Sequence, residues 1–376
     1  MKNFRACVGN TIINRENYFS AVNDVLQRQS IFRYHDDDTI SSLLESRLSE
    51  IFYSENCRVL CNATAALKSA LLALSPNIGD VVLIPRHTFI ATAGAILSCG
   101  LIPKLVDTDE YGGMSVVELR NILESGRLPF AIIAVHLDGS SCKISEIQSI
   151  AKEYGVYLIE DASQAFGVRH KDRLVGTFGE FGCFSFQENK ILSSGEGGAF
   201  ICNKSDYFAN ACMYSDNGCT REGSIPSWNE NSFFGENYKI TELCSSIILQ
   251  QLEDFDEIKN KLWQNYEKVV GSLDKKNIRF ERRDIGDMPV SVWFNDVEVI
   301  ENLKRNGFTC IDWSVWDLSV HPVILGKKSP YGDGFPWNLR KSEDNVEHFK
   351  KYVRVSLPIP FDETNFERLF LKVELL

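Results

Sequence analysis

Short runs of continuous apolar residues alternate with helical stretches along the first half of this chain. The runs at 81–84, 130–135 and 156–159 (VVLI, FAIIAV and VYLI) are apolar at nearly every position, and helical patterns at 88–98 and 144–154 lie between them. A strand that is apolar on both faces is typical of a parallel sheet covered by helices. The pattern therefore predicts an α/β fold with a mostly parallel central sheet, in which ligands bind beyond the carboxyl ends of the strands.

The remaining pattern predicts a large domain followed by a smaller one. Thr39 is expected to cap a helix that begins at residue 40, and one long amphipathic helix is expected from about 240 to 270. Other short elements are a helix at 63–74 and strands at 59–60, 103–106, 183–186, 198–202, 290–293 and 353–355. We therefore expect an amino-terminal arm over 1–38, a large domain over 39–250 and a smaller α+β domain over 251–376.

Charge and cysteine content exclude several classes of function. The 376 residues include 40 Lys and Arg against 51 Asp and Glu, a net charge of −11, and an acidic surface repels nucleic acid. The 11 cysteines form no CxxC pair, so we expect reduced, buried cysteines and no metal site. No apolar run approaches the ~18 residues of a membrane span, and the start of the chain has no apolar signal core. We therefore expect a cytoplasmic protein.

Two segments at the ends of predicted strands carry chemically useful residues. Asp161 follows the run at 156–159, in the block EDASQA, and Lys190 ends the block FSFQENK at 184–190, before the glycine-rich block SGEGG at 194–198. A lysine in such a loop can form a Schiff base, and glycine permits a tight turn or close approach of a ligand. Taken singly, each has a plainer interpretation: Asp161 as a helix N-cap, Lys190 as a solvated lysine, and the glycines as a hairpin turn.

Together these residues match the needs of a pyridoxal phosphate site. That cofactor requires a lysine for its aldehyde, a carboxylate that keeps its pyridine nitrogen protonated, and a cradle of backbone N–H groups for its phosphate. Lys190 and Asp161 supply the first two, and the sequence ATAAL at 63–67, which opens a predicted helix, supplies the third. Phe89, near the start of the helix after Pro85, is a candidate for stacking on the ring.

A series of blocks along the chain resembles the DegT/DnrJ/EryC1/StrS sugar aminotransferases, a family of fold-type-I pyridoxal phosphate enzymes. The resemblance is strong over about residues 40–260 and weak beyond them. The blocks are NATAAL at 62–67 (SGTAAL in the family), PRHTFIATA at 85–93 (PxxTFxATA), VHLDG at 135–139 (VHLYG), EDASQA, FSFQENK, SGEGG, and GENYK at 235–239 (GxNYR). Their recurrence in the same order is far more specific than any single block.

The resemblance implies a role for each candidate residue. Lys190 would hold the cofactor and move the proton at the substrate carbon, and Asp161 would pair with the pyridine nitrogen. Asn237 would reach the cofactor phosphate of the neighbouring subunit, which implies a homodimer with shared active sites; its plainer interpretation is a cap on the long helix. The other residues would surround the cofactor, with Gln164 near its 3-oxygen or ring face, Phe89 on the ring, and the Ala63 amide, Thr64 and Ser185 on the phosphate.

The implied reaction moves an amino group from an amino acid, expected to be glutamate, to a keto sugar. The expected acceptor is a nucleotide-linked keto-deoxysugar, and the product is an amino sugar for a polysaccharide or a secondary metabolite. Dehydratases of the family carry histidine at the lysine position, so Lys190 favours transamination. His136 is expected near the site in a packing and hydrogen-bonding role. Two alternatives stay open: a dehydratase or cyclase acting on a related keto-sugar or amino-acid substrate, and a non-catalytic regulator that binds the cofactor.

This sequence departs from the family pattern mainly where the substrate pocket is shaped. Ala63 replaces the glycine of the phosphate turn, and Lys239 replaces an arginine, which removes a bidentate anion contact. The carboxyl-terminal third lacks the family's HYxxxH stretch and carries Trp313, Trp316 and Trp337 instead. These tryptophans are interpreted either as a sugar-stacking surface or as core of the small domain.

Overall fold

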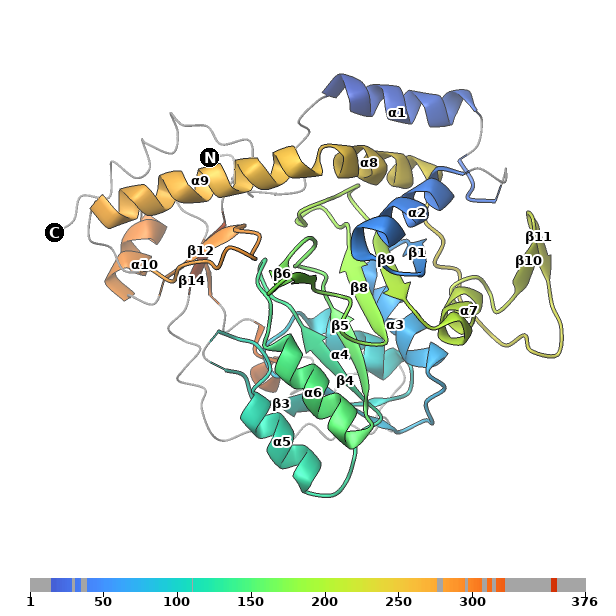
Figure 1. The fold of residues 1–376 in the computed structure, drawn as a ribbon, viewed down its shortest axis with the longest axis horizontal. Coiled ribbons are helices and arrows are strands. Elements are labelled where there is room, and N and C mark those ends of the chain that lie inside the picture. The colour runs from blue at the N-terminus through green and yellow to red at the C-terminus, as the bar shows by residue number, and fades with distance from the viewer. Residues whose placement is uncertain are drawn as a thin grey trace.

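The computed structural model describes residues 15–28, 31–34, 39–109, 111–275, 280–294, 297–305, 310–312, 316–321 and 353–356. Its centre is a seven-stranded sheet in the order β1-β9-β8-β5-β4-β2-β3 (Figure 1). The strands are β1 (Asn56–Leu60), β2 (Val81–Pro85), β3 (Ile102–Val106), β4 (Ala131–Val135), β5 (Tyr157–Asp161), β8 (Phe181–Ser185) and β9 (Gly198–Cys202). The strands from β8 to β3 run parallel, and β9 is antiparallel to both of its neighbours. The expected mostly parallel α/β sheet is confirmed.

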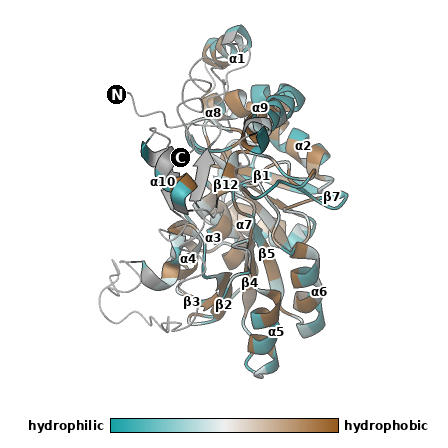
Figure 2. Cartoon of the chain, turned by 90° about the vertical axis from the view of Figure 1, so that its left-hand side faces the viewer, coloured by the Kyte–Doolittle hydropathy of each residue, from teal (hydrophilic) through white to brown (hydrophobic). Residues whose placement is uncertain are grey.

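Helices cover both faces of the sheet, which explains why its strands are apolar throughout. The covering helices are α3 (Ala63–Ala73), α4 (Ile90–Ser98) and α7 (Ser205–Tyr214) on one face, and α5 (Val116–Glu124) and α6 (Ile144–Tyr154) on the other. In β4, Ile133 packs with the first group and Ile132 with the second. Successive strand residues point to opposite faces, so a strand covered on both sides is apolar at every position. Figure 2 shows this concentration of apolar residues in the sheet.

The long helix expected from about 240 to 270 is two helices. Helix α8 (Glu242–Glu253) ends at Asp254, and α9 (Phe255–Lys275) follows it along the top of the molecule in Figure 1. Asp254 has φ −88° and ψ 6° and caps α8 with its N–H group on the Gln250 carbonyl. Aspartate is a weak helix former that favours such end positions. The hydrophobic period continues across this residue and therefore did not reveal the break.

The remaining elements lie outside the central sheet. A helix from residue 40 and strands near 290–293 and 353–355 were expected, and the others were not. Helix α1 (Arg15–Gln27) lies within the predicted arm and contacts α8. Helix α2 (Ile40–Phe52) begins after Thr39, whose side chain accepts the N–H of Ser42, as expected. The other elements are β6 (Arg169–His170), β7 (Arg173–Leu174), a hairpin of β10 (Thr220–Glu222) and β11 (Ile225–Ser227), α10 (Val297–Arg305), η3 (Leu318–Val320) and a sheet of β12 (Ser291–Phe294), β14 (Val353–Ser356) and β13 (Cys310–Asp312). The two boundaries between the three predicted domains stay predictions.

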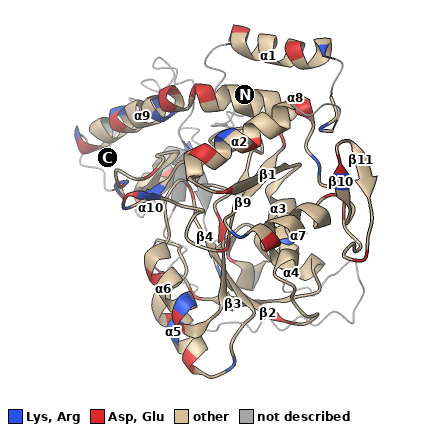
Figure 3. Cartoon of the chain, turned by 45° about the vertical axis from the view of Figure 1, so that its right-hand side comes forward, with Lys and Arg blue, Asp and Glu red and all other residues tan. Residues whose placement is uncertain are grey.

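Several outer helices carry charged residues of both signs. In Figure 3, both signs of charge mark α5, α6 and α9. Among the described helices, none has the length and the apolar character that crossing a membrane requires. Within the described ranges, His, Cys, Asp and Glu side chains form no group of three that could hold a metal ion.

Candidate active site

The candidate site lies at the carboxyl edge of the sheet, where β4, β5 and β8 end side by side. Asp161 is the last residue of β5, and its register partners are Val135 at the end of β4 and Cys183 on β8. The N–H of His136, the residue after β4, donates to the Asp161 carbonyl at 3.0 Å. Because parallel strands end at a common edge, the fold places Asp161 near the loop after β8 that carries Lys190.

Asp161 is buried and held by two donors. The hydroxyl of Thr92, on α4, donates to its Oδ2 at 2.8 Å, and the N–H of Ser163 donates to its Oδ1 at 3.2 Å. The second contact closes a local turn, because residues 162–168 form turns rather than a helix. The interpretation of Asp161 as a helix N-cap is therefore wrong. The carboxylate is fixed in orientation and has lone pairs left to accept another donor.

Lys190 lies in a hairpin loop between the antiparallel strands β8 and β9. The loop is closed by backbone hydrogen bonds from Phe186 to Gly197 at 2.8 Å and from Glu188 to Gly195 at 3.0 Å. Gly195 has a left-handed backbone with φ +88°, which favours glycine. The glycine block is thus a hairpin turn, and it also fixes the loop that carries Lys190. The lysine side chain is half-buried, so it is more enclosed than an ordinary surface lysine.

The amino terminus of α3 and the end of β8 form a cradle suited to a phosphate group. Asn62 caps α3, and its side chain accepts the Ala65 N–H at 2.8 Å. Gly198 pairs with Ser185 on one side and with Leu60 on the other. A Cβ on Gly198 would lie 2.3 Å from the Asn62 carbonyl carbon and 2.6 Å from the Ala63 nitrogen. The missing side chain therefore lets the start of α3, with Ala63 and Thr64, approach the strand end that carries Ser185.

Two further candidate residues lie on turns at the same edge. Phe89 precedes α4, after β2, and is 54% exposed, so its ring is available to a ligand. Gln164 lies in the turn after Asp161, where its Oε1 accepts the Asp138 N–H at 3.1 Å. Its carbonyl also accepts the Gly139 N–H at 2.9 Å. The structure thus brings Phe89 and Gln164 to turns that follow β2 and β5.

His136 and Glu160 form a fully buried pair behind the site. The histidine Nε2 lies 3.0 Å from Glu160 Oε2, and its Nδ1 accepts the Cys142 N–H at 3.3 Å. Glu160 also accepts the N–H of Gly176 at 2.7 Å and of Gly179 at 2.8 Å. These contacts agree with the packing and hydrogen-bonding role expected for His136. The role of Glu160 was not expected; the signal that could have revealed it is a charged residue directly after the apolar run at 156–159.

Asn237 lies on an exposed segment beside Asp216, with which it forms an isolated β-bridge. It does not cap α8, because Thr241 does so with its own side chain. Burial acts to raise the pKa of Asp216, but hydrogen bonds from Arg221 at 2.9 Å and Lys239 at 2.6 Å hold that pKa well below its ordinary value. Lys239, which replaces the family arginine, is thus paired with a carboxylate of this chain.

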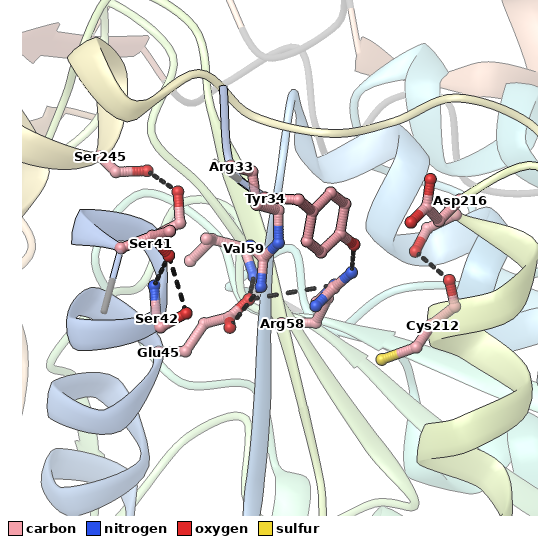
Figure 4. Close-up of polar contacts among 12 residues, drawn as sticks. Arg33, Tyr34, Ser41, Ser42, Glu45, Arg58, Val59, Cys212, Asp216 and Ser245 are labelled. Carbon is pink, nitrogen blue, oxygen red and sulfur yellow. Dashed lines mark hydrogen bonds and ion pairs between the residues drawn. The ribbon is translucent and has the colours of Figure 1, made fainter. Parts of the chain in front are cut away.

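A layer of charged side chains joins this segment to residues 31–34. Figure 4 shows the part of it that contains Arg33, Tyr34 and Arg58. The guanidinium of Arg33 pairs with Glu45 of α2 at 2.6 Å, and Arg58 of β1 donates to the Tyr34 hydroxyl. Arg221 lies over the Tyr34 ring, 3.9 Å from its centroid. Arg221 also binds Asp216, which pairs with Asn237. Arg221 therefore links residues 31–34 to the Asn237 segment. The sequence offered one signal of this layer, a charged Arg58 within β1.

Residues 316–321 contact the loop that follows β2. Asp317 forms a two-point ion pair with buried Arg86, at 2.9 and 2.8 Å. Burial acts to raise the pKa of Asp317, but the bonds from Arg86 and Ser319 hold it below its ordinary value. Trp316 is partly buried against the main core cluster, and its carbonyl accepts the Thr88 N–H at 3.2 Å. Trp316 therefore packs against the core cluster of the central sheet. Trp313 and Trp337 lie outside the described residues.

Comparison with known sequences identifies related proteins. The model of the DegT/DnrJ/EryC1/StrS aminotransferase family matches residues 13–307 of the chain. GDP-perosamine synthase from Escherichia coli O157:H7 is 34% identical over 233 residues, which cover 61% of this chain and 62% of that protein. The chain spans 57% to 62% of the length of this and two other curated relatives.

Solved structures share the fold over nearly the whole chain. The aminotransferase from Psychrobacter cryohalolentis has a TM-score of 0.78 at 21% identity, with 95% of both chains covered. The E. coli GDP-4-keto-6-deoxy-D-mannose-3-dehydratase, with bound hydrated PLP, has a TM-score of 0.80 at 17% identity, with 98% of this chain and 99% of that chain covered. At these identities the likeness shows the fold, which is the expected fold type I.

Proposed function

Because the chain belongs to the DegT/DnrJ/EryC1/StrS aminotransferase family, we propose that it moves an amino group from an amino acid to a keto sugar with the help of pyridoxal phosphate. One observation carries this proposal. Asp161, the Lys190 loop and the start of α3 meet at one edge of the sheet, and they are the three parts that this cofactor requires. The family is pyridoxal phosphate-dependent, so the cofactor class follows from membership.

The residues at this edge fit the cofactor. Any side chain at position 198 would place its Cβ in the space beside Asn62 and Ala63. The cradle also presents the first N–H groups of helix α3, which favour binding of a phosphate. The Ala63 N–H, Thr64 and the Ser185 hydroxyl would hold the phosphate. Asp161 would hold a proton on the pyridine nitrogen, and Phe89 would lie on the ring.

When bound, the cofactor supplies an electron sink that stabilises negative charge at the substrate carbon. The Lys190 amine would hold the cofactor and then, once displaced, take the proton from that carbon. Thr92 would fix the Asp161 carboxylate toward the ring, because it donates to Oδ2 at 2.8 Å. Asn237 would complete the phosphate site of a second copy of the chain, since it is exposed and is not used as a helix cap.

We place the acceptor among keto sugars, with a nucleotide-linked keto-deoxysugar as the leading candidate and glutamate as the donor. Support comes from the sequence relatives, among them the GDP-perosamine synthase from E. coli. Lys190 disfavours the dehydratase alternative, in which a histidine stands at that position. A regulator that binds the cofactor without turnover is distinguished from an enzyme by the experiment below.

The test is the visible absorbance of the purified protein with pyridoxal phosphate, before and after excess glutamate. We expect conversion to the pyridoxamine form with release of 2-oxoglutarate, and covalent trapping of the cofactor on Lys190 by borohydride. Lys190→Ala is expected to abolish both, whereas Lys152→Ala, which changes an exposed lysine on α6, is expected to change neither. A bound cofactor that no amino donor converts would contradict amino transfer.

A further inference from the structure

A buried aspartate joins the carboxyl-terminal strands to the candidate cofactor site. Asp138 lies three residues beyond the end of β4, and its φ of 52° is in the left-handed region that residues other than glycine seldom adopt. It occupies the tyrosine position of the family block VHLYG. We propose that Asp138 is a positioning residue. Through contacts with residues 283–293, called here the carboxyl-terminal segment, it holds Gln164 in place for the cofactor. This inference rests on the proposed function.

The first part of the link is the Asp138 carboxylate. Its Oδ2 accepts hydrogen bonds from Arg283 Nη2 at 2.9 Å, from Trp293 Nε1 at 2.6 Å and from the Ser291 hydroxyl. The side chains of the ion pair are 1% and 3% exposed. A buried charge with several donors fixes its partners, and loss of that charge leaves a buried arginine unpaired. The carboxylate therefore holds β12 and residue 283 against the loop after β4.

The second part of the link is the backbone of that loop. The N–H groups of Asp138 and Gly139 donate to the side-chain oxygen and the carbonyl of Gln164, at 3.1 and 2.9 Å. On its other side, Gly139 approaches residue 288 so closely that a Cβ would lie 1.9 Å from the Met288 carbonyl oxygen. The Met288 N–H donates to the Gly139 carbonyl at 2.8 Å. The loop is thus held between the carboxyl-terminal segment and Gln164. A shift of the carboxyl-terminal segment is therefore expected to move Gln164.

The left-handed backbone adds to this dependence. An unusual backbone conformation persists only where its surroundings stabilise it. Here the contacts of the carboxylate and of Gly139 supply that stabilisation. Loss of the charge is therefore expected to relax the loop and to free the Gln164 side chain. Asp138→Asn is the suitable change, because asparagine tolerates a left-handed backbone and differs mainly in charge.

The experiment is a double-mutant cycle read by cofactor affinity and not by turnover. Pyridoxal phosphate is titrated into apo protein for the wild type, Asp138→Asn, Gln164→Ala and the double variant. We expect Asp138→Asn to raise the dissociation constant about tenfold in the wild-type background, and less than about twofold when Gln164 is already alanine. Val292→Ala is the control, because it removes packing from buried β12 and leaves the Asp138 contacts in place.

A merely structural role would give a different result. Equal effects of Asp138→Asn in both backgrounds, or an equal loss of affinity in Val292→Ala at a matched fall in Tm, would overturn the proposal. If Asp138→Asn does not fold, Trp293→Phe removes one donor of the same carboxylate, and about a threefold effect that disappears with Gln164→Ala is expected. Wild-type protein that binds no pyridoxal phosphate would refute the proposed function itself, whereas normal binding by these variants would refute only the role of Asp138.

Discussion

Glu160 and Asp161 are neighbouring carboxylates with opposite surroundings. Successive residues of a strand point to opposite faces of the sheet. Glu160 faces the turn at 176–179, where it accepts three backbone N–H groups, and Asp161 faces α4 through Thr92. The first carboxylate is therefore committed to holding a turn, and the second has capacity left for a ligand. This contrast separates a structural carboxylate from a candidate catalytic one within two adjacent residues.

The two carboxylates are expected to respond differently to removal of their charge. Glu160→Gln should lower the free energy of unfolding by about 2 kcal/mol, because the amide nitrogen cannot accept the N–H groups that the carboxylate accepts. Asp161→Asn should leave the Tm nearly unchanged and slow the glutamate half-reaction at least about 100-fold, because the amide no longer favours a protonated pyridine nitrogen. Thermal unfolding and stopped-flow absorbance measure the two effects. Equal loss of stability in both variants would argue against this division.

At the scale of elements, Gly198 brings β1, β8 and the start of α3 together. Gly198→Ala is expected to force apart β9 and the Asn62 backbone and to raise the dissociation constant of pyridoxal phosphate at least about tenfold, since the phosphate cradle opens. Gly271→Ala is the matched control, because a Cβ at that position of α9 meets nothing within 4 Å. The control should bind the cofactor normally and gain about 0.5–1 kcal/mol of stability. Normal binding by Gly198→Ala would show that the cradle is not the phosphate site.

The sheet was predictable from the sequence, and much of what surrounds it was not. Strands covered on both faces are continuous apolar runs, so β2, β4 and β9 lie within two residues of their expected positions. The rule that ligands bind at the carboxyl ends of parallel strands then placed Asp161 and Lys190 at one edge. Contacts such as that between Asp138 and Arg283 join residues 145 positions apart, and no local pattern reveals them. The break at Asp254 was hidden because the amphipathic period runs through it.

For the whole molecule, the proposed sharing of active sites between two subunits predicts complementation between inactive variants. Lys190→Ala and Asn237→Ala are each expected to lose most activity as homodimers. A mixed dimer has one site with both native residues, so an equal mixture of exchanged chains should recover about a quarter of wild-type activity. Activity of the unfractionated exchanged mixture measures this, and mixed dimers isolated through two different tags should show about half of wild-type activity. The control is a mixture of Lys190→Ala with Asp161→Asn. Both residues are contributed to a site by the same subunit, so this mixture should recover no activity. If the first mixture also recovered no activity, the result would argue against shared active sites.

The edge position of β1 has a consequence for synthesis of the chain. β1 joins the sheet only through β9, although roughly 140 residues separate them in the sequence. Ribosomes add about 5–20 residues per second, so a nascent chain carries an unpaired β1 for roughly ten seconds or longer before its partner exists. Over that interval the growing polypeptide exposes an unpaired strand edge that chaperones or other nascent chains can bind. The proposed phosphate cradle can form only after Gly198 has left the ribosome, so cofactor binding at this cradle would come late in the synthesis of the protein.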